Sequence, residues 1–292
     1  MPMTKTGLFL LGAALLAGVL VACSPVTALN ALAPGHTHTV SRDVAYGPGP
    51  RQQLDVYRPA RAAPRGGWPV VVFFYGGSWN RGKRGDYAFV GEALASRGIL
   101  TVVADYRLYP EVRYPDFLRD SAAALAWGLG HAQELGGNPR RVFVMGHSAG
   151  AYNAAMLAFD ARWLKATHHD PRELAGFIGL AGPYDFLPIV NPDARPVFFH
   201  PDYPPGTQPL EHAGRGAPRS FLGAASNDEL VNPQRNSQGL ATKLQGAGVP
   251  VTLKFYDRVG HMTLVAALAA PLRWLAPVLE DVAAFVNAAP ER

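Results

Sequence analysis

A serine set in the surroundings of a nucleophile lies near the middle of the chain, in the sequence Gly-His-Ser-Ala-Gly at 146–150. An apolar run at 142–145 precedes it, and small helix-favouring residues follow it to residue 158, which predicts a buried strand, a sharp turn and a helix. Glycine at both ends of the pattern suits a turn in which side chains would collide with neighbouring backbone. Ser148 is therefore expected to project above a sheet as a nucleophile, and an ordinary Gly/Ser turn is the alternative.

A serine hydroxyl attacks a carbonyl only when a base takes its proton, so a histidine and an orienting acid should follow Ser148. In a strand-turn-helix arrangement of this kind the order along the chain is serine, acid, histidine. We expect His261 to be the base, because it alone follows the last strand-like run, at 251–255, and lies in a turn before a helical pattern. The other histidines downstream of Ser148 are His168, His169, His200 and His212.

The orienting acid is expected to be Asp228. A penultimate strand is predicted at 220–225, and Asp228 lies in the loop that leaves it, where such a carboxylate belongs. Asp185, after an earlier strand, and Asp257, close to His261 in sequence, are rival candidates. Glu229 is interpreted as a solvated loop charge.

A glycine pair follows an earlier strand and suggests an oxyanion hole. The apolar run 69–75 ends in Gly76-Gly77-Ser78-Trp79, and backbone N–H groups that approach a substrate oxygen closely leave no room for side chains. Gly76 or Gly77, with the N–H of Ala149, is expected to hold the oxyanion. A plain tight turn is the alternative.

The first 22 residues predict a signal peptide. Lys5 supplies a positive start, residues 8–22 are apolar and uncharged, and Cys23 follows as the single cysteine of the chain. Leu-Val-Ala-Cys at 20–23 resembles the lipobox of bacterial lipoproteins, which implies lipidation of Cys23 and attachment to a membrane of the cell envelope; Ser24 favours the outer membrane by the same resemblance. Ordinary cleavage beside an incidental cysteine is the alternative. Residues 23–40 are expected to be a flexible tether, and 41–292 the catalytic domain.

The order of expected elements predicts an α/β fold. Runs at 40–46 and 53–57 alternate apolar and polar residues around a Gly/Pro turn, which indicates an opening antiparallel hairpin. Strand and helix then alternate three times before residue 160, which favours a mainly parallel central sheet flanked by helices. The 292 residues, 48% of them hydrophobic, can bury one large core. The net charge of +5 comes from scattered Lys and Arg, so no nucleic-acid partner is expected.

A proline-rich segment at 183–218 predicts a small partial cap over the site. It holds nine prolines and little periodicity, so neither a long helix nor a long strand is expected there. A cap would carry aromatic side chains to the substrate pocket, namely Phe186, Phe198, Phe199 and Tyr203. A surface excursion is the alternative.

Taken together, these motifs resemble the α/β-hydrolase superfamily. Within it the chain resembles the bacterial carboxylesterase and feruloyl-esterase-like branch, which is similar in turn to isoprenylcysteine methylesterases and kynurenine formamidases. The resemblance covers about residues 44–290. Its further carriers are Leu-Asp-Val-Tyr-Arg-Pro at 54–59, Asp-Tyr-Arg-Leu at 105–108, Gly-Gly-Asn-Pro-Arg-Arg at 136–141 and Asp-Glu-Leu-Val at 228–231. Where many relatives have histidine before the glycine pair, this chain has Tyr75.

The resemblance implies a serine hydrolase that cleaves carboxylic esters of small to medium size through a Ser148–His261–Asp228 triad, with no metal or organic cofactor. Hydrolysis of an aryl formamide or another small amide is one alternative, since the same groups suffice for it. A non-catalytic lipoprotein that uses the fold as a binding scaffold is another. The oligomeric state is not indicated by the sequence.

Overall fold

One eight-stranded sheet organises the chain in the computed structural model, which describes residues 25–288. Its strand order is β1-β2-β4-β3-β5-β6-β7-β8, antiparallel where β2 pairs with β1 and β4, and parallel from β4 to β8. The strands are β1 (His38–Ala45), β2 (Gln53–Pro59), β3 (Trp68–Phe74), β4 (Leu100–Ala104), β5 (Gly137–His147), β6 (Gly176–Leu180), β7 (Ser220–Ala225) and β8 (Val251–Tyr256). This confirms the opening hairpin and the mainly parallel sheet.

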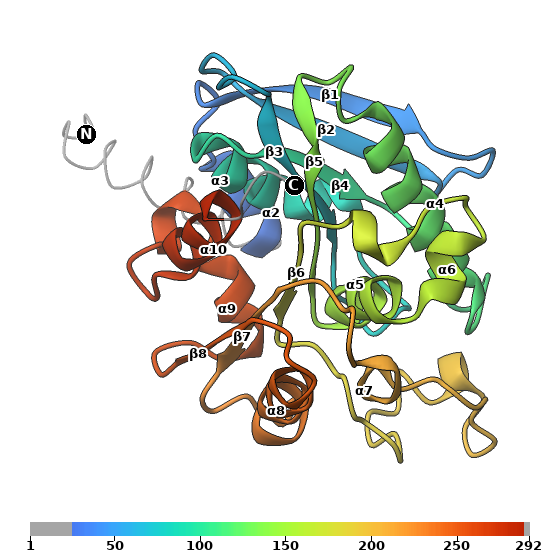
Figure 1. The fold of residues 1–292 in the computed structure, drawn as a ribbon. Coiled ribbons are helices and arrows are strands. Elements are labelled where there is room, and N and C mark those ends of the chain that lie inside the picture. The colour runs from blue at the N-terminus through green and yellow to red at the C-terminus, as the bar shows by residue number, and fades with distance from the viewer. Residues whose placement is uncertain (1–24, 289–292) are drawn as a thin grey trace, which may run out of the picture.

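Helices cover both faces of the sheet (Figure 1). On one face α4 (Asp116–His131), α5 (Ala149–Phe159) and α6 (Ala161–Lys165) contact one another, and α7 (Pro209–His212) joins α5 to α8 (Gly239–Gly246). On the other face α3 (Ala88–Ser96) packs against α10 (Val278–Asn287), and α9 (His261–Ala266) lies against β7. The result is a three-layer sandwich with the sheet in the middle.

The central strands are buried on both faces. Every residue of β4, β6 and β7 is buried, as is each residue of β3 after Trp68. Continuous apolar runs such as 69–75 therefore fit strands with helices above and below, whereas alternating runs fit the half-exposed hairpin. Parallel strands end at a common edge, so the loops that leave β3, β5, β7 and β8 meet there.

The segment at 183–218 folds over this edge with little regular structure. It contains one turn of 3-10 helix at Pro196–Phe198 and the short helix α7. Of the four aromatic residues expected at the pocket, Phe186 lines it, whereas Phe198 is fully buried against Trp79. Phe199 is partly exposed and its ring contacts Arg113. Tyr203 does not line the pocket either, and its hydroxyl accepts the N–H of Ile189. The segment therefore joins the core through one aromatic residue and shapes the pocket through another.

The N-terminal part of the described chain differs from the predicted tether. Residues Pro25–Ala31 form a helix, α2, that packs against α3 and the 3-10 turn Arg84–Tyr87 before it. The Asn30 amide donates to the carbonyls of Gly85 and Asp86 and accepts the N–H of Phe89. Sequence periodicity over seven residues is too short to predict such docking.

Two sequence-based predictions for the N-terminus, the signal peptide and the lipidated Cys23, lie outside the described residues. Among residues 25–288, no helix combines the length and apolar character needed to cross a membrane.

Candidate active site

The serine lies on a sharp turn between β5 and α5. Ser148 has φ 54° and ψ −123°, a backbone conformation that costs energy for a residue with a side chain and is typical of a nucleophile elbow. The two flanking glycines make the turn possible. A Cβ at Gly146 would lie 2.1 Å from the carbonyl oxygen of Gly150, and one at Gly150 would lie 2.0 Å from that of Phe74.

We expect the substitution Gly150→Ala to destabilise the protein by at least about 2 kcal/mol, because the new methyl group would overlap rigid backbone. The free energy of unfolding in urea measures this. Gly130→Ala is the matched control, since Gly130 lies in α4 and a Cβ there meets nothing within 4 Å; it should be neutral or stabilise the protein by up to about 1 kcal/mol. Equal effects of the two changes would contradict the strained elbow.

The structure brings Ser148, His261 and Asp228 together in one hydrogen-bonded line. The His261 Nε2 lies 2.8 Å from the Ser148 Oγ, and its Nδ1 lies 2.7 Å from the Asp228 Oδ2. His261 is the first residue of α9, and Asp228 lies in the loop after β7. The His261 side chain is 7% exposed and that of Asp228 is not exposed. This is the geometry by which a histidine removes a serine proton while a carboxylate orients its ring.

The environment of Asp228 keeps its carboxylate charged. Burial by itself raises the pKa of Asp228, but the hydrogen bond from His261 and those from the N–H groups of Val231 and Leu230 outweigh it and lower the pKa below its usual value. Both N–H groups donate to the Oδ1, each at 2.9 Å. The Oδ2 is thereby directed at His261.

The two rival acids have other partners. Asp185 forms an ion pair with Arg235 at 3.0 Å, and Asp257 accepts a hydrogen bond from the Ser226 hydroxyl. Geometry therefore favours Asp228, as the sequence predicted.

His147 is a feature of the site that sequence reasoning missed. Its Nε2–H donates to the backbone carbonyl of His261 at 3.0 Å, and the two rings lie 5.1 Å apart. The ring is completely buried, and this burial, together with the nearby His261, lowers the pKa of His147 to about 3. A neutral His147 thus fixes the backbone that carries His261. Its place between Gly146 and the serine was the only signal available.

The lowered pKa of His147 should make the free energy of unfolding depend on pH. Its pKa is about 3 when folded, against 6.5 for an unperturbed histidine, so between these values the unfolded chain binds a proton that the folded chain does not. The stability it contributes is present above its unfolded pKa and is lost as pH falls, by up to about 1.4 kcal/mol per unit.

From pH 6.5 to about pH 4.5, the unfolding free energy of the wild type should fall by about 2 kcal/mol more than that of His147→Gln, which can still donate to His261 but does not titrate. Urea titrations at several pH values measure the difference. Parallel profiles of the two proteins would contradict the buried neutral ring.

The backbone of 76–79 lies beside the serine. A Cβ at Gly76 would lie 2.9 Å from that of Ser148, and one at Gly77, where φ is +127°, would lie 2.3 Å from the carbonyl oxygen of Arg81. Ala149 is the first residue of α5, so its N–H has no acceptor within the helix. Gly76, Gly77 and Ala149 all line the same pocket as Ser148. Their positions suit donors to an oxyanion.

Tyr75, directly before the glycine pair, braces this loop from within. Its buried hydroxyl donates to the Asp105 carboxylate at 2.8 Å and accepts from Arg51 at 2.7 Å. Its ring stacks on Tyr106, whose hydroxyl donates to the Tyr75 carbonyl oxygen. Tyr75 therefore supplies a polar anchor for the glycine pair that follows it.

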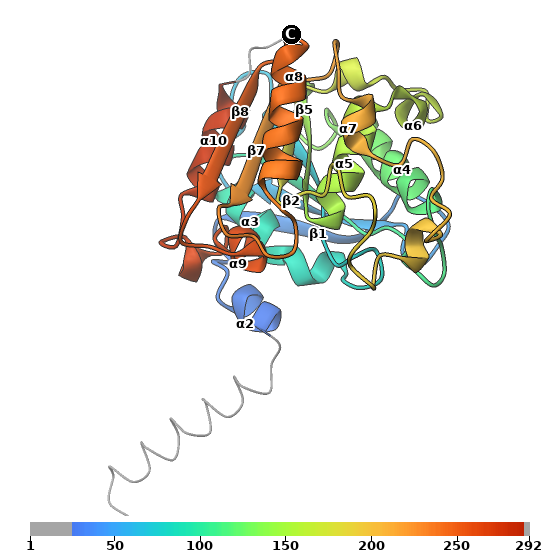
Figure 2. The ribbon, with the colours of Figure 1, turned by 90° about the horizontal axis from the view of Figure 1, so that it is seen from below.

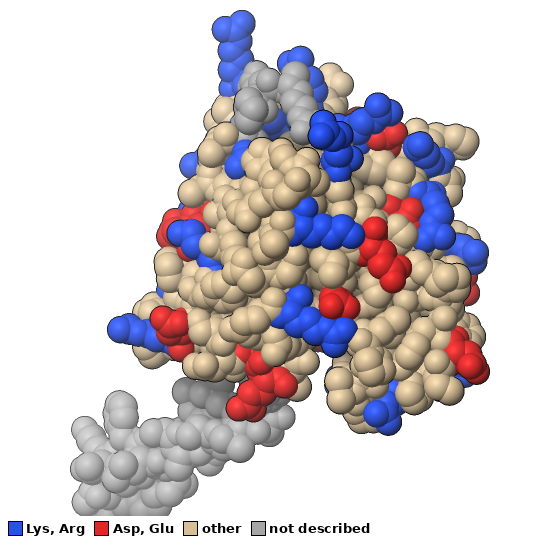
Figure 3. Space-filling model, turned by 60° about the horizontal axis from the view of Figure 1, so that its bottom comes forward, with Lys and Arg blue, Asp and Glu red and all other residues tan. Residues whose placement is uncertain are grey.

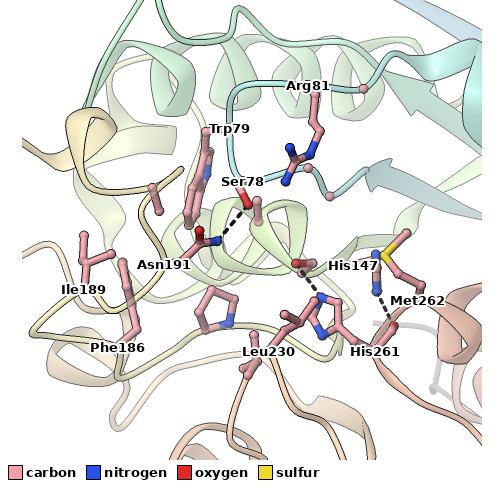
Figure 4. Close-up of a pocket in the computed structure, with 18 of the residues that line it drawn as sticks. Ser78, Trp79, Arg81, His147, Phe186, Ile189, Asn191, Leu230, His261 and Met262 are labelled. Atoms are coloured by element: carbon pink, nitrogen blue, oxygen red, sulfur yellow. Dashed lines mark hydrogen bonds between the residues drawn. The ribbon is translucent and has the colours of Figure 1, made fainter.

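A pocket of about 470 Å³ opens at the serine. Figure 4 shows Trp79, Phe186 and Ile189 along one wall and Leu230 and Met262 beside His261. Asn191 of the cap segment donates to the Ser78 hydroxyl at 3.1 Å. The cap and the glycine loop thus border a largely apolar space at Ser148.

Comparisons with known proteins identify the family of the chain. A family model described as BD-FAE matches residues 54–244. A probable isoprenylcysteine alpha-carbonyl methylesterase, ICMEL1 of Oryza sativa subsp. japonica, is 31% identical over 256 residues, which cover 80% of this chain and 59% of the relative. Carboxylesterase NlhH of Mycobacterium tuberculosis is 32% identical over 70% of this chain and 69% of its own length. The chain spans less than two thirds of the plant relatives' length.

Solved structures show the same fold. Esterase Est2 of Thermogutta terrifontis, with butyrate bound, aligns with a TM-score of 0.68 and 21% identity over 86% of this chain and 94% of its own. An inhibited esterase B from Lactobacillus rhamnosis aligns with a TM-score of 0.74 and 18% identity over 94% of this chain and 95% of its own.

Proposed function

The chain belongs to the BD-FAE family and has the α/β-hydrolase fold, and from this we propose that it is a serine esterase cleaving small- to medium-sized carboxylic esters. The observation that carries the proposal is the hydrogen-bonded line from Ser148 through His261 to Asp228, which ends in the pocket. Carboxylesterase NlhH and the plant methylesterase bear names of ester hydrolases, which supports the same reaction class.

The reaction proceeds in two halves. His261 takes the proton of the Ser148 hydroxyl as its oxygen bonds to the acyl carbon, and the same proton passes to the alcohol when the ester C–O bond breaks. Asp228 stabilises the charged imidazole ring. Water then attacks the acyl-enzyme with His261 again as base. The bond between the acyl carbon and the Ser148 oxygen breaks, His261 returns the proton to that oxygen, and the acid leaves.

We assign the stabilisation of the negative charge on the carbonyl oxygen to the N–H groups of Gly76 or Gly77 and of Ala149, which line the pocket with Ser148. Each such donor accelerates the reaction on the order of 10²- to 10³-fold.

Turnover of p-nitrophenyl esters of increasing acyl length, together with labelling of Ser148 by a fluorophosphonate, tests the proposal. Turnover of esters with a preferred acyl length is the expected result. Faster turnover of an aryl formamide than of the matched ester would make the protein an amidase. A folded protein with neither turnover nor labelling would favour the non-catalytic scaffold.

Export and lipid attachment at Cys23 are part of the same proposal. They are supported by the lipobox-like sequence at 20–23 and by the single cysteine. We expect cells fed an alkyne fatty acid to label the wild-type protein and not Cys23→Ala, as detected by click chemistry on the purified chain. Equal labelling of both proteins would rule out the attachment.

A further inference from the structure

We infer that the mouth of the pocket docks on a lipid surface and that the enzyme takes its substrate from the bilayer. The inference rests on the proposed esterase activity and specifies its substrate class, an amphiphilic carboxylic ester held in lipid. It is argued from an apolar rim, from the position of α2 and from the distribution of charge.

Three exposed apolar side chains surround the opening of the pocket. Val190, Leu230 and Met262 line it and are 82%, 71% and 54% exposed. They come from the cap segment, from the loop after β7 and from α9. Seven large hydrophobic side chains are exposed among residues 25–288, so almost half of them gather at this one opening. Such clustering of exposed apolar side chains marks an interaction site for an apolar partner.

Helix α2 brings the N-terminal part of the chain to the same opening. Val26 lines the pocket, and Leu29 packs against the core. The three hydrogen bonds of Asn30 hold α2 in place. Figure 2 shows α2 at the edge of the molecule where α9 also lies. The described chain therefore begins at the rim of the pocket and is fastened there.

The short distance from this rim to Cys23 restricts how the domain can face a membrane. Only Ser24 and Pro25 lie between Cys23 and Val26. An extended chain covers at most about 3.5 Å per residue step, so an anchor at Cys23, three steps from Val26, would lie within about 10 Å of the pocket wall. The apolar run at 8–22 comes directly before it. Whether acyl chains or this run enter the bilayer, the attachment point lies at the pocket mouth.

The distribution of charge does not favour a partner other than neutral lipid at the pocket mouth. On the face shown in Figure 3, Lys and Arg are interspersed with Asp and Glu and form no single basic patch. At the pocket, Arg81 is paired with Asp193 at 2.7 Å. Apolar contact, rather than attraction to anionic headgroups, therefore drives the docking, and a neutral phosphatidylcholine surface suffices.

The orientation is tested with the full chain in phosphatidylcholine vesicles. A bimane probe is placed on Leu230→Cys and, as matched control, on Trp274→Cys. Trp274 is 73% exposed, like Leu230, but it lies in a separate hollow beside β8. The parent chain, labelled in the same way, gives the background signal from Cys23. Lipids brominated in their acyl chains should quench the probe at 230 at least about fivefold more than that at 274, since docked side chains reach about 5–10 Å into the bilayer. Equal quenching, or a dimer that shields position 230, would overturn the inference.

The substrate class is tested by where the ester is placed. p-Nitrophenyl laurate should be hydrolysed at least about tenfold faster in the protein's own vesicles than in separate ones, because its long chain holds it in lipid. p-Nitrophenyl butyrate, which exchanges through water, should react equally in both arrangements. Equal rates for laurate would overturn the inference. Absence of butyrate turnover would instead contradict the proposed esterase activity. The quenching of the two probes would still test whether the pocket mouth docks on lipid.

Discussion

Replacing Ser148 by alanine is expected to lower kcat for p-nitrophenyl butyrate by about 10⁶-fold, to the level left by binding and the oxyanion donors alone. The serine Oγ is the one atom placed both 2.8 Å from the His261 Nε2 and inside the pocket, so no neighbouring hydroxyl can take over the attack. Steady-state kinetics of the two proteins, with fluorophosphonate labelling as a second readout, measure the loss.

The fold of the variant should be unaffected, because alanine and serine bear similar backbone strain at φ 54°. Alanine fits the elbow as serine does, so the unfolding free energy of Ser148→Ala should stay within about 1 kcal/mol of the wild type. A folded variant that retained a tenth of the activity would show that another nucleophile operates.

The parts of the site that sequence predicted have local signals. The elbow combines a short motif with a strand before it and a helix after it. Asp228 and His261 were found because parallel strands end at one edge, so that residues just after the strands predicted at 220–225 and 251–255 must lie near Ser148. Chain order and the ends of strands therefore predicted three side chains that are up to 113 residues apart.

The parts that sequence did not predict depend on contacts between distant segments. Nothing beside His147 indicates that its ring reaches the carbonyl of residue 261, because that contact exists only after β5 and α9 come together. Helix α2 is too short for a periodic pattern, and it is held by contacts with distant residues, among them the hydrogen bonds of Asn30. The bracing of Tyr75 likewise joins three segments, through Arg51 and Asp105. Tertiary packing, not local propensity, decides each of these.

Asp228→Asn is expected to lower kcat by about 10⁴-fold with little change in KM, because it reverses the tautomer of His261. The N–H groups of Leu230 and Val231 both donate to the Oδ1, so the amide oxygen of the asparagine will occupy that position and its NH₂ group will face His261. A ring nitrogen that accepts from this NH₂ leaves the proton on the Nε2, which then cannot take the proton of Ser148. Kinetics on the same ester at neutral pH measure the effect.

Asp257→Asn is the matched control for this change. Asp257 lies four residues before His261, yet its carboxylate accepts a hydrogen bond from the Ser226 hydroxyl, a bond that an amide oxygen can also accept. We expect kcat to stay within about twofold of the wild type, as for a surface position. If Asp257→Asn caused the large loss and Asp228→Asn did not, the orienting acid would be Asp257, and the loop after β7 would have only a structural role.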